Sequence, residues 1–149
     1  MKDYIIQNKT AWEYNAYDFW LKQMGTPQNY ATRIAADPLK ALRRFAACFD
    51  RYEGVRIANI CGSCGKKAVP LAVLGAEVTV FDISEDNRRY AVELSDAAGV
   101  QIDYQVCDVL EIFMTLIPVI IWMLWLRNQI RKCLKLTGRT VLCTKKSKF

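Results

Sequence analysis

The residues best suited to binding chemistry are small and acidic side chains that follow consecutive predicted strands. An apolar stretch at 55–60 leads into the loop 61–65, of sequence CGSCG, and a second at 77–81 leads into Asp82. Small residues allow the backbone to approach a ligand closely, and the N–H groups that open the following helix attract negative charge. A carboxylate at the end of the next strand can accept hydrogen bonds from both hydroxyls of a ribose. The pattern predicts a pocket for a nucleoside.

Alternating strands and helices must position these residues. From Val55 onward, residues 66–74 are predicted to form a helix that Gly75 ends, Ser84 caps a second helix, and residues 102–106 form a third strand. Strands separated by helices of this length form a parallel sheet, so the chain is predicted to be an α/β protein. Ligands of such sheets bind at the carboxyl ends of the strands, which here are the loops 61–65, 82–84 and 107–109.

The first fifty residues are predicted to be helical. Apolar residues recur every four positions from Trp12 to Met24, which indicates one helix over 9–24 that ends at Gly25-Thr26-Pro27. A second helix is predicted to begin at Asp37-Pro38, with an apolar face that comprises Leu39, Leu42, Ala46 and Phe49.

Composition excludes several classes of function. The net charge of +6 comes from residues 127–149, which hold eight Lys or Arg and no acid, so the remainder is slightly acidic and no nucleic acid is expected as a partner. The absence of histidine excludes His-based triads and His-ligated metals, and no metal site is expected. Six cysteines without the spacing of a secreted scaffold, and no apolar signal at the start, predict a cytoplasmic protein.

The loop and the two acids resemble the class I S-adenosylmethionine-dependent methyltransferases, over about residues 9–112. The glycine-rich loop of that family reads acid, apolar, Gly-x-Gly-x-Gly, and the corresponding residues here are Asn59, Ile60, Cys61, Gly62, Ser63, Cys64 and Gly65. Cys61 and Ser63 stand at the first two glycine positions, and Asn59 replaces the acid. Both substitutes are small enough to preserve the close approach of a ligand.

The resemblance implies a Rossmann-like parallel sheet that binds S-adenosylmethionine and transfers its methyl group to a small-molecule substrate. By analogy Asp82 would hold the ribose, Ile83 would pack against adenine, and Asp108 would contact the adenine amino group beside Val109. The implied cofactor-binding residues are Asn59, Cys61, Gly62, Ser63, Gly65, Asp82, Ile83, Asp108 and Val109. The N-terminal helix, with Trp12, Tyr17 and Trp20, resembles a cap over the cofactor. No catalytic residue can be named.

The pair Cys61 and Cys64 supports an alternative function. A C-x-x-C pair between a strand and a helix is the arrangement that lowers a thiol pKa for disulfide exchange, so a thiol-disulfide oxidoreductase is the second hypothesis. A structural zinc site lacks an evident second ligand pair. A nicotinamide dehydrogenase would need a third glycine three residues after Gly65.

The sequence changes character after Ile112. Residues 113–126 are almost wholly apolar, but these 14 residues are fewer than the roughly 20 that span a bilayer. The basic residues that follow them would suit a cytoplasmic flank, so a tail-anchored, membrane-associated binding protein is a further alternative. Reading this stretch back into codons and shifting the frame by one base gives a polar stretch, then an aspartate and apolar residues, as a fourth strand would require. We hypothesise that residues 113–149 are translated out of frame.

Three segments are therefore expected. They are a helical cap at 1–52, a cofactor-binding βαβαβ half-domain at 53–112, and an aberrant apolar then basic tail at 113–149. Such a chain would retain the adenosine half of the pocket, with an incomplete C-terminal half. Its exposed sheet edge is predicted to promote self-association.

Overall fold

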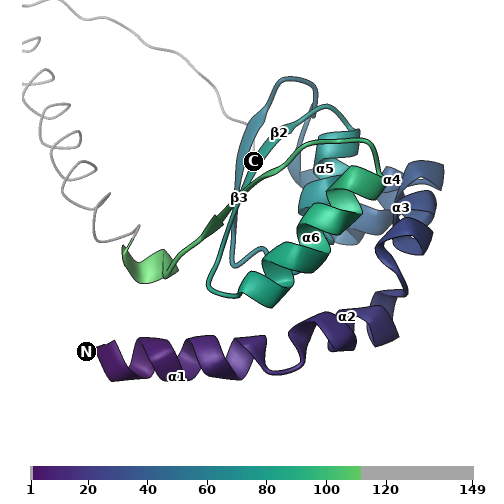
Figure 1. The fold of residues 1–149 in the computed structure, drawn as a ribbon. Coiled ribbons are helices and arrows are strands. Elements are labelled where there is room, and N and C mark those ends of the chain that lie inside the picture. Colours follow the sequence, from purple (N-terminus) through teal and green to yellow (C-terminus); the bar gives the residue numbers. More distant parts are fainter. Residues whose placement is uncertain (1, 112–149) are drawn as a thin grey trace, which may run out of the picture. The chain divides into compact units, whose positions relative to one another are not determined.

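The computed structural model describes residues 2–111, and the arrangement of their helices and strands is drawn in Figure 1. The chain divides into two compact units, 1–109 and 110–149, and the first holds every element discussed below. The predicted tail and its frameshift hypothesis lie outside the described residues. The helices are α1 (Lys2–Glu13), α2 (Ala16–Met24), α3 (Pro27–Ala36), α4 (Pro38–Leu42), α5 (Ala68–Val73) and α6 (Glu85–Ala97), and the strands are β1 (Arg56–Ile60), β2 (Glu77–Asp82) and β3 (Asp103–Val106).

The strands form one parallel sheet in the order β1-β2-β3. Ile60 pairs with Phe81, and Asp82 pairs with Val106, so the carboxyl ends of all three strands meet at the same edge. The predicted α/β fold class with a parallel sheet is confirmed. The loops that follow these strands lie where ligands of parallel sheets bind.

One face of the sheet carries the core. Val78 and Val80 of β2 are buried against Leu42, Leu71 and Ala91 from the surrounding helices. Figure 1 shows α3, α5 and α6 on the same side of the strands. These helices pack on one another around a second cluster, whose fully buried members include Ile34, Val69, Tyr90 and Leu94. The strands and the loop 61–65 therefore adjoin a packed layer of helices.

Side-chain caps start the helices next to the sheet. The Ser84 hydroxyl accepts a hydrogen bond of 3.1 Å from the Asn87 N–H at the start of α6, and Asp37 Oδ1 accepts one of 2.9 Å from the Lys40 N–H at the start of α4. Both caps confirm the sequence prediction. Helix α5 begins at Ala68, two residues later than predicted.

The predicted single helix over 9–24 is wrong. The chain forms α1 and α2 instead, because Asn15 between them takes a left-handed conformation with φ of 50°. Asparagine tolerates this conformation better than most residues. A periodic apolar pattern continues across the break, and for that reason the pattern alone could not reveal it.

The segment after α2 also differs from the prediction. Thr26 and Pro27, interpreted as a helix end, are the cap and first residue of α3, because the Thr26 hydroxyl accepts the Asn29 N–H at 3.3 Å. The helix from Asp37 is short and is followed by a 3-10 helix at Arg43–Cys48. Leu39, predicted to face the core, is 47% exposed.

The partner predictions for membranes and for self-association are not borne out. Among residues 2–111, no helix is long and apolar enough to cross a bilayer.

Candidate functional site

The loop at the end of β1 has a backbone that ordinarily requires glycine. Cys61 has a φ of 51° and Ser63 a φ of 54°, while Gly65 has a φ of 76°. Side chains with a Cβ rarely adopt such values, because the Cβ approaches the following carbonyl oxygen. The two positions where the resemblance expects glycine are therefore positions where the backbone demands it, although the chain has cysteine and serine there.

The other loop glycines are required by space. A Cβ on Gly62 would lie 2.5 Å from Val80 Cγ1 and 2.8 Å from Asn59 Nδ2, and one on Gly65 would lie 2.9 Å from the Cβ of Ala91. These distances are shorter than van der Waals contacts. Gly62 thus brings the loop down onto β2, and Gly65 brings α5 close to α6. Asn59 lies under the loop, and its buried Nδ2 has no hydrogen-bond partner among the described residues.

Asp82 is the polar centre of the site. Its Oδ2 accepts the Ser63 N–H at 2.9 Å, and its Oδ1 accepts the Ser84 N–H at 3.1 Å and Asn87 Nδ2 at 3.2 Å. An ionised carboxylate has about four acceptor positions, so these donors leave one position, on Oδ2. One acceptor position of the Asp82 carboxylate therefore remains beyond these three hydrogen bonds.

Two residues that the sequence analysis missed hold this arrangement. The Tyr104 hydroxyl on β3 donates a 2.9 Å hydrogen bond to the Ser63 carbonyl, so the Ser63 residue is held at its N–H and at its C=O. Asn87 on α6 is buried between Asp82 and Trp20, whose indole N–H donates to Asn87 Oδ1 at 2.7 Å. Only the position of Asn87 within the first turn after the Ser84 cap could have indicated its role.

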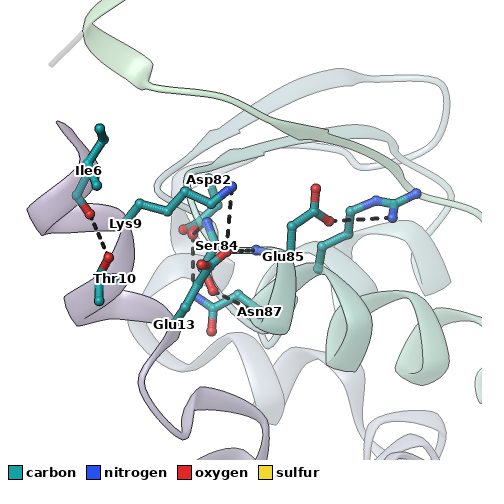
Figure 2. A network of polar contacts seen from close by, with 9 residues as sticks. Ile6, Lys9, Thr10, Glu13, Asp82, Ser84, Glu85 and Asn87 are labelled. Atoms are coloured by element: carbon teal, nitrogen blue, oxygen red, sulfur yellow. Dashed lines mark hydrogen bonds and ion pairs between the residues drawn. The ribbon is translucent and has the colours of Figure 1, made fainter. Parts of the chain in front are cut away.

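Helix α1 reaches the same edge of the sheet. Glu13 Oε1 accepts the backbone N–H of Glu85 at 3.0 Å, and Figure 2 shows this contact beside Asp82 and Ser84. A carboxylate at the N-terminus of α6 is stabilised by the helix dipole. Of the three predicted cap residues, Trp20 and Tyr17 bind α6 through Asn87 and Glu93, whereas Trp12 is 65% exposed.

The loops after β1, β2 and β3 come together as predicted. Burial raises the pKa of the Cys61 thiol, and the negative charges of Asp82 and Asp108 raise this pKa further. The Cys107 N–H donates to the Asp82 carbonyl at 2.9 Å and fixes the start of the segment that carries Asp108 and Val109. Ile83, half-buried, lies between Asp82 and Ser84.

Burial is the main influence on the pKa of both loop thiols. Burial raises the pKa of Cys64 to about 11, and Cys64 is fully buried, while the pKa of Cys61 is also raised. Disulfide exchange requires a thiolate, which a lowered pKa supplies. Both thiols are free.

A cavity of about 480 Å³ adjoins the loop. Ser63 and Asn87 line it, and α1, α2 and the turn between them supply the aromatic side chains of its lining, namely Trp12, Tyr14, Phe19 and Trp20. This volume is in the range of small-molecule sites. The cavity therefore places a mostly apolar space directly beside the predicted cofactor loop.

Comparison with known proteins identifies the fold. No family model matches the sequence, and no curated protein matches it. The structure is similar to that of magnesium protoporphyrin IX methyltransferase from Synechocystis PCC 6803 with bound S-adenosylhomocysteine, with a TM-score of 0.50, 17% identity and coverage of 71% of this chain. The form with bound S-adenosylmethionine gives a TM-score of 0.47, 19% identity and 71% coverage.

The chain spans about half the length of these solved structures, 52% of the first and 55% of the second. The part of the chain that the structure describes has the parallel sheet and flanking helices that the sequence analysis predicted. The chain has an α/β fold with a parallel sheet and flanking helices, similar to that of this S-adenosylhomocysteine-bound methyltransferase.

Proposed function

We propose that residues 2–111 bind S-adenosylmethionine, as the cofactor-binding half of a small-molecule methyltransferase. The observation that carries this proposal is Asp82, a carboxylate at the carboxyl end of β2 that three donors hold beside a loop of glycine-type backbone. In parallel sheets this is the position at which an acid contacts a ribose.

The residues present fit the cofactor. Gly62 lets the loop backbone pack closely onto β2, because a Cβ there would collide with Val80 and Asn59. The free acceptor position on Asp82 suits a ribose hydroxyl, and Asp108 supplies a second carboxylate near the loop, where an amino group of adenine could donate. Asn59, Cys61, Ser63 and Gly65 would shape the loop, and Ile83 and Val109 would contact the adenine.

Methyl transfer needs an acceptor beside the donor, and the cavity at Ser63 and Asn87 is the space that adjoins the loop. The bound cofactor would supply an electrophilic methyl group, and this chain's contribution would be to hold the cofactor and the acceptor in line. We therefore propose methyl transfer to a small molecule as the activity of the complete fold. We also propose a cytoplasmic location, because the cysteine spacing of the sequence is not that of a secreted scaffold.

Isothermal titration of the full chain with S-adenosylhomocysteine tests the proposal. Asp82→Asn removes the charge that accepts the ribose hydroxyl, and we expect the affinity to fall at least about tenfold. Asp103→Asn is the matched control, because Asp103 is an exposed acid at the opposite end of β3, and its affinity should stay unchanged. Folded wild-type protein that gives no binding heat would refute the proposal.

A further inference from the structure

A second cavity, of about 400 Å³, lies between α3 and α4 and shares no lining residue with the aromatic cavity or the loop. Its lining includes three basic side chains, Arg33 from α3, Lys40 from α4 and Arg43 directly after α4. The proposed function uses none of these residues. The cavity therefore needs an explanation of its own.

Positive charge dominates this cavity. Three of its lining residues are cations, and Asp37 is the acid among them. Within residues 2–111, neither Arg33, Lys40 nor Arg43 forms an ion pair with an acid. Asp37 uses its Oδ1 to cap α4 through the Lys40 N–H. The three cations thus line one cavity, and no ion pair among the described residues neutralises their charge.

Arg33 is held in place before any ligand arrives. One of its Nη atoms donates to the Met24 carbonyl at 3.3 Å, and the guanidinium lies over the Tyr30 ring, with its central carbon 5.1 Å from the ring centroid. A fixed guanidinium loses less conformational entropy when it binds an anion, and its remaining N–H groups form a planar fork. Arg33 is therefore suited to bidentate contact with a tetrahedral oxyanion.

The backbone at Arg43 is strained where it meets the same cavity. Arg43 has a φ of 56° and a ψ of −131°, and its N–H bonds the carbonyls of Leu39 and Lys40. Strain of this kind persists only when the surrounding structure imposes it, and it is frequent at ligand sites. Nearby, Lys67 Nζ donates to the Ala41 and Leu42 carbonyls, and its pKa is lowered by burial and then by the charge of Arg43.

We propose that the cavity between α3 and α4 binds a small molecule through a phosphate monoester group held by Arg33, Lys40 and Arg43. Two guanidinium groups and one ammonium group match a dianion with three acceptor oxygens, and charge-assisted hydrogen bonds of this type are the stronger ones in proteins. A pocket of this volume has room for more than the phosphate alone.

Isothermal titration of the full chain with inorganic phosphate, in a low-salt buffer, tests this site. We expect saturable binding that Arg33→Gln and Arg43→Gln each weaken about tenfold, the loss of one charged hydrogen bond. Arg44→Gln is the matched control, because Arg44 is adjacent in sequence but stacks on Phe45 and does not line the cavity. Its affinity for phosphate should stay within about twofold of wild type.

Arg33→Lys guards against a variant that fails to fold. It keeps the charge and removes the fork, so we expect an affinity between those of the wild type and Arg33→Gln. If all the arginine variants, Arg44→Gln included, lost the same affinity for phosphate, the binding would come from the overall positive charge of the surface, and the proposal would be overturned. Tighter binding of single-stranded RNA, equally weakened by each variant, would also overturn it, and so would the absence of phosphate binding by folded protein.

Discussion

The indole N–H of Trp20 donates to Oδ1 of Asn87 at 2.7 Å, and this contact determines how Asn87 faces Asp82. An indole nitrogen can only donate, so the amide oxygen of Asn87 must face Trp20, and the amide nitrogen must face the carboxylate. Asn87 Nδ2 accordingly lies 3.2 Å from Asp82 Oδ1. Helix α2 thereby orients a group in the predicted ribose site without touching the ribose position itself.

Replacing Trp20 by phenylalanine is predicted to weaken cofactor binding. Trp20→Phe preserves much of the packing but removes the donor, so the Asn87 amide can rotate and present its oxygen to Asp82. We expect the affinity for S-adenosylhomocysteine to fall about three- to tenfold, as for the loss of one neutral hydrogen bond. Tyr4→Phe removes a hydroxyl from an exposed ring of α1 that does not line the cavity, and it should leave the affinity unchanged. Equal affinities for both variants would contradict the role of Trp20.

Glycine at the two strained loop positions is predicted to stabilise the protein. Cys61→Gly and Ser63→Gly each remove a Cβ from a left-handed residue, and the relief exceeds the entropy lost with glycine. We expect each to raise the free energy of unfolding by about 0.5–1 kcal/mol, measured by urea denaturation. Cys48→Gly should instead lower it, because Cys48 is an exposed residue of the 3-10 helix with an ordinary backbone. A lower free energy of unfolding for both loop variants would show that the Cys61 and Ser63 side chains stabilise the fold by more than the backbone strain destabilises it.

A methyl group at Gly62 is predicted to destabilise the folded protein by steric collision. Gly62→Ala would push its Cβ to within 2.5 Å of Val80 Cγ1, and we expect a loss of about 1–3 kcal/mol in the free energy of unfolding. Val80→Ala removes the colliding atom. The double variant should therefore lose less free energy of unfolding than the two single variants lose together, which a double-mutant cycle measures. Strict additivity would contradict the collision.

Cys64 is predicted to make the stability of the protein fall at high pH. Burial raises its pKa from 9.0 to about 11 in the folded state, so the folded protein retains a proton that the unfolded chain releases. The resulting stabilisation is complete below about pH 9 and is lost as the pH rises toward 11, by at most about 1.4 kcal/mol per pH unit.

Urea denaturation of the wild type and of Cys64→Ala across this pH range measures the effect. The variant should lose less stability than the wild type as the pH rises, although it starts lower because a buried side chain is truncated. Parallel curves for the two proteins would mean that the thiol does not titrate in this way.

Local signals in the sequence predicted those parts of the fold that depend on neighbouring residues. Ser84 and Asp37 cap helices because each accepts a backbone N–H three residues later, which a sequence shows directly. The loop was recognised from small residues between apolar strands. Helix α3 was missed, because Thr26-Pro27 can end one helix and start the next, and only the structure shows that it does both.

The missed residues of the site depend on contacts between distant parts of the chain. Tyr104 meets Ser63 across 41 positions, and Trp20 meets Asn87 across 67. No periodicity or spacing encodes such pairs. The acceptor position that remains on Asp82 was likewise beyond the sequence, because it depends on the Ser63 N–H turning toward the carboxylate.

The double tether of Ser63 has a consequence for the order of folding. Its N–H bonds a residue 19 positions away and its C=O a residue 41 positions away, on two different strands. Contacts between such distant positions form only after the chain between them has closed into loops. We therefore expect the loop to acquire its final shape after β2 and β3 have paired. Protection of the Ser63 amide from hydrogen exchange should then appear together with that of the β2 and β3 amides.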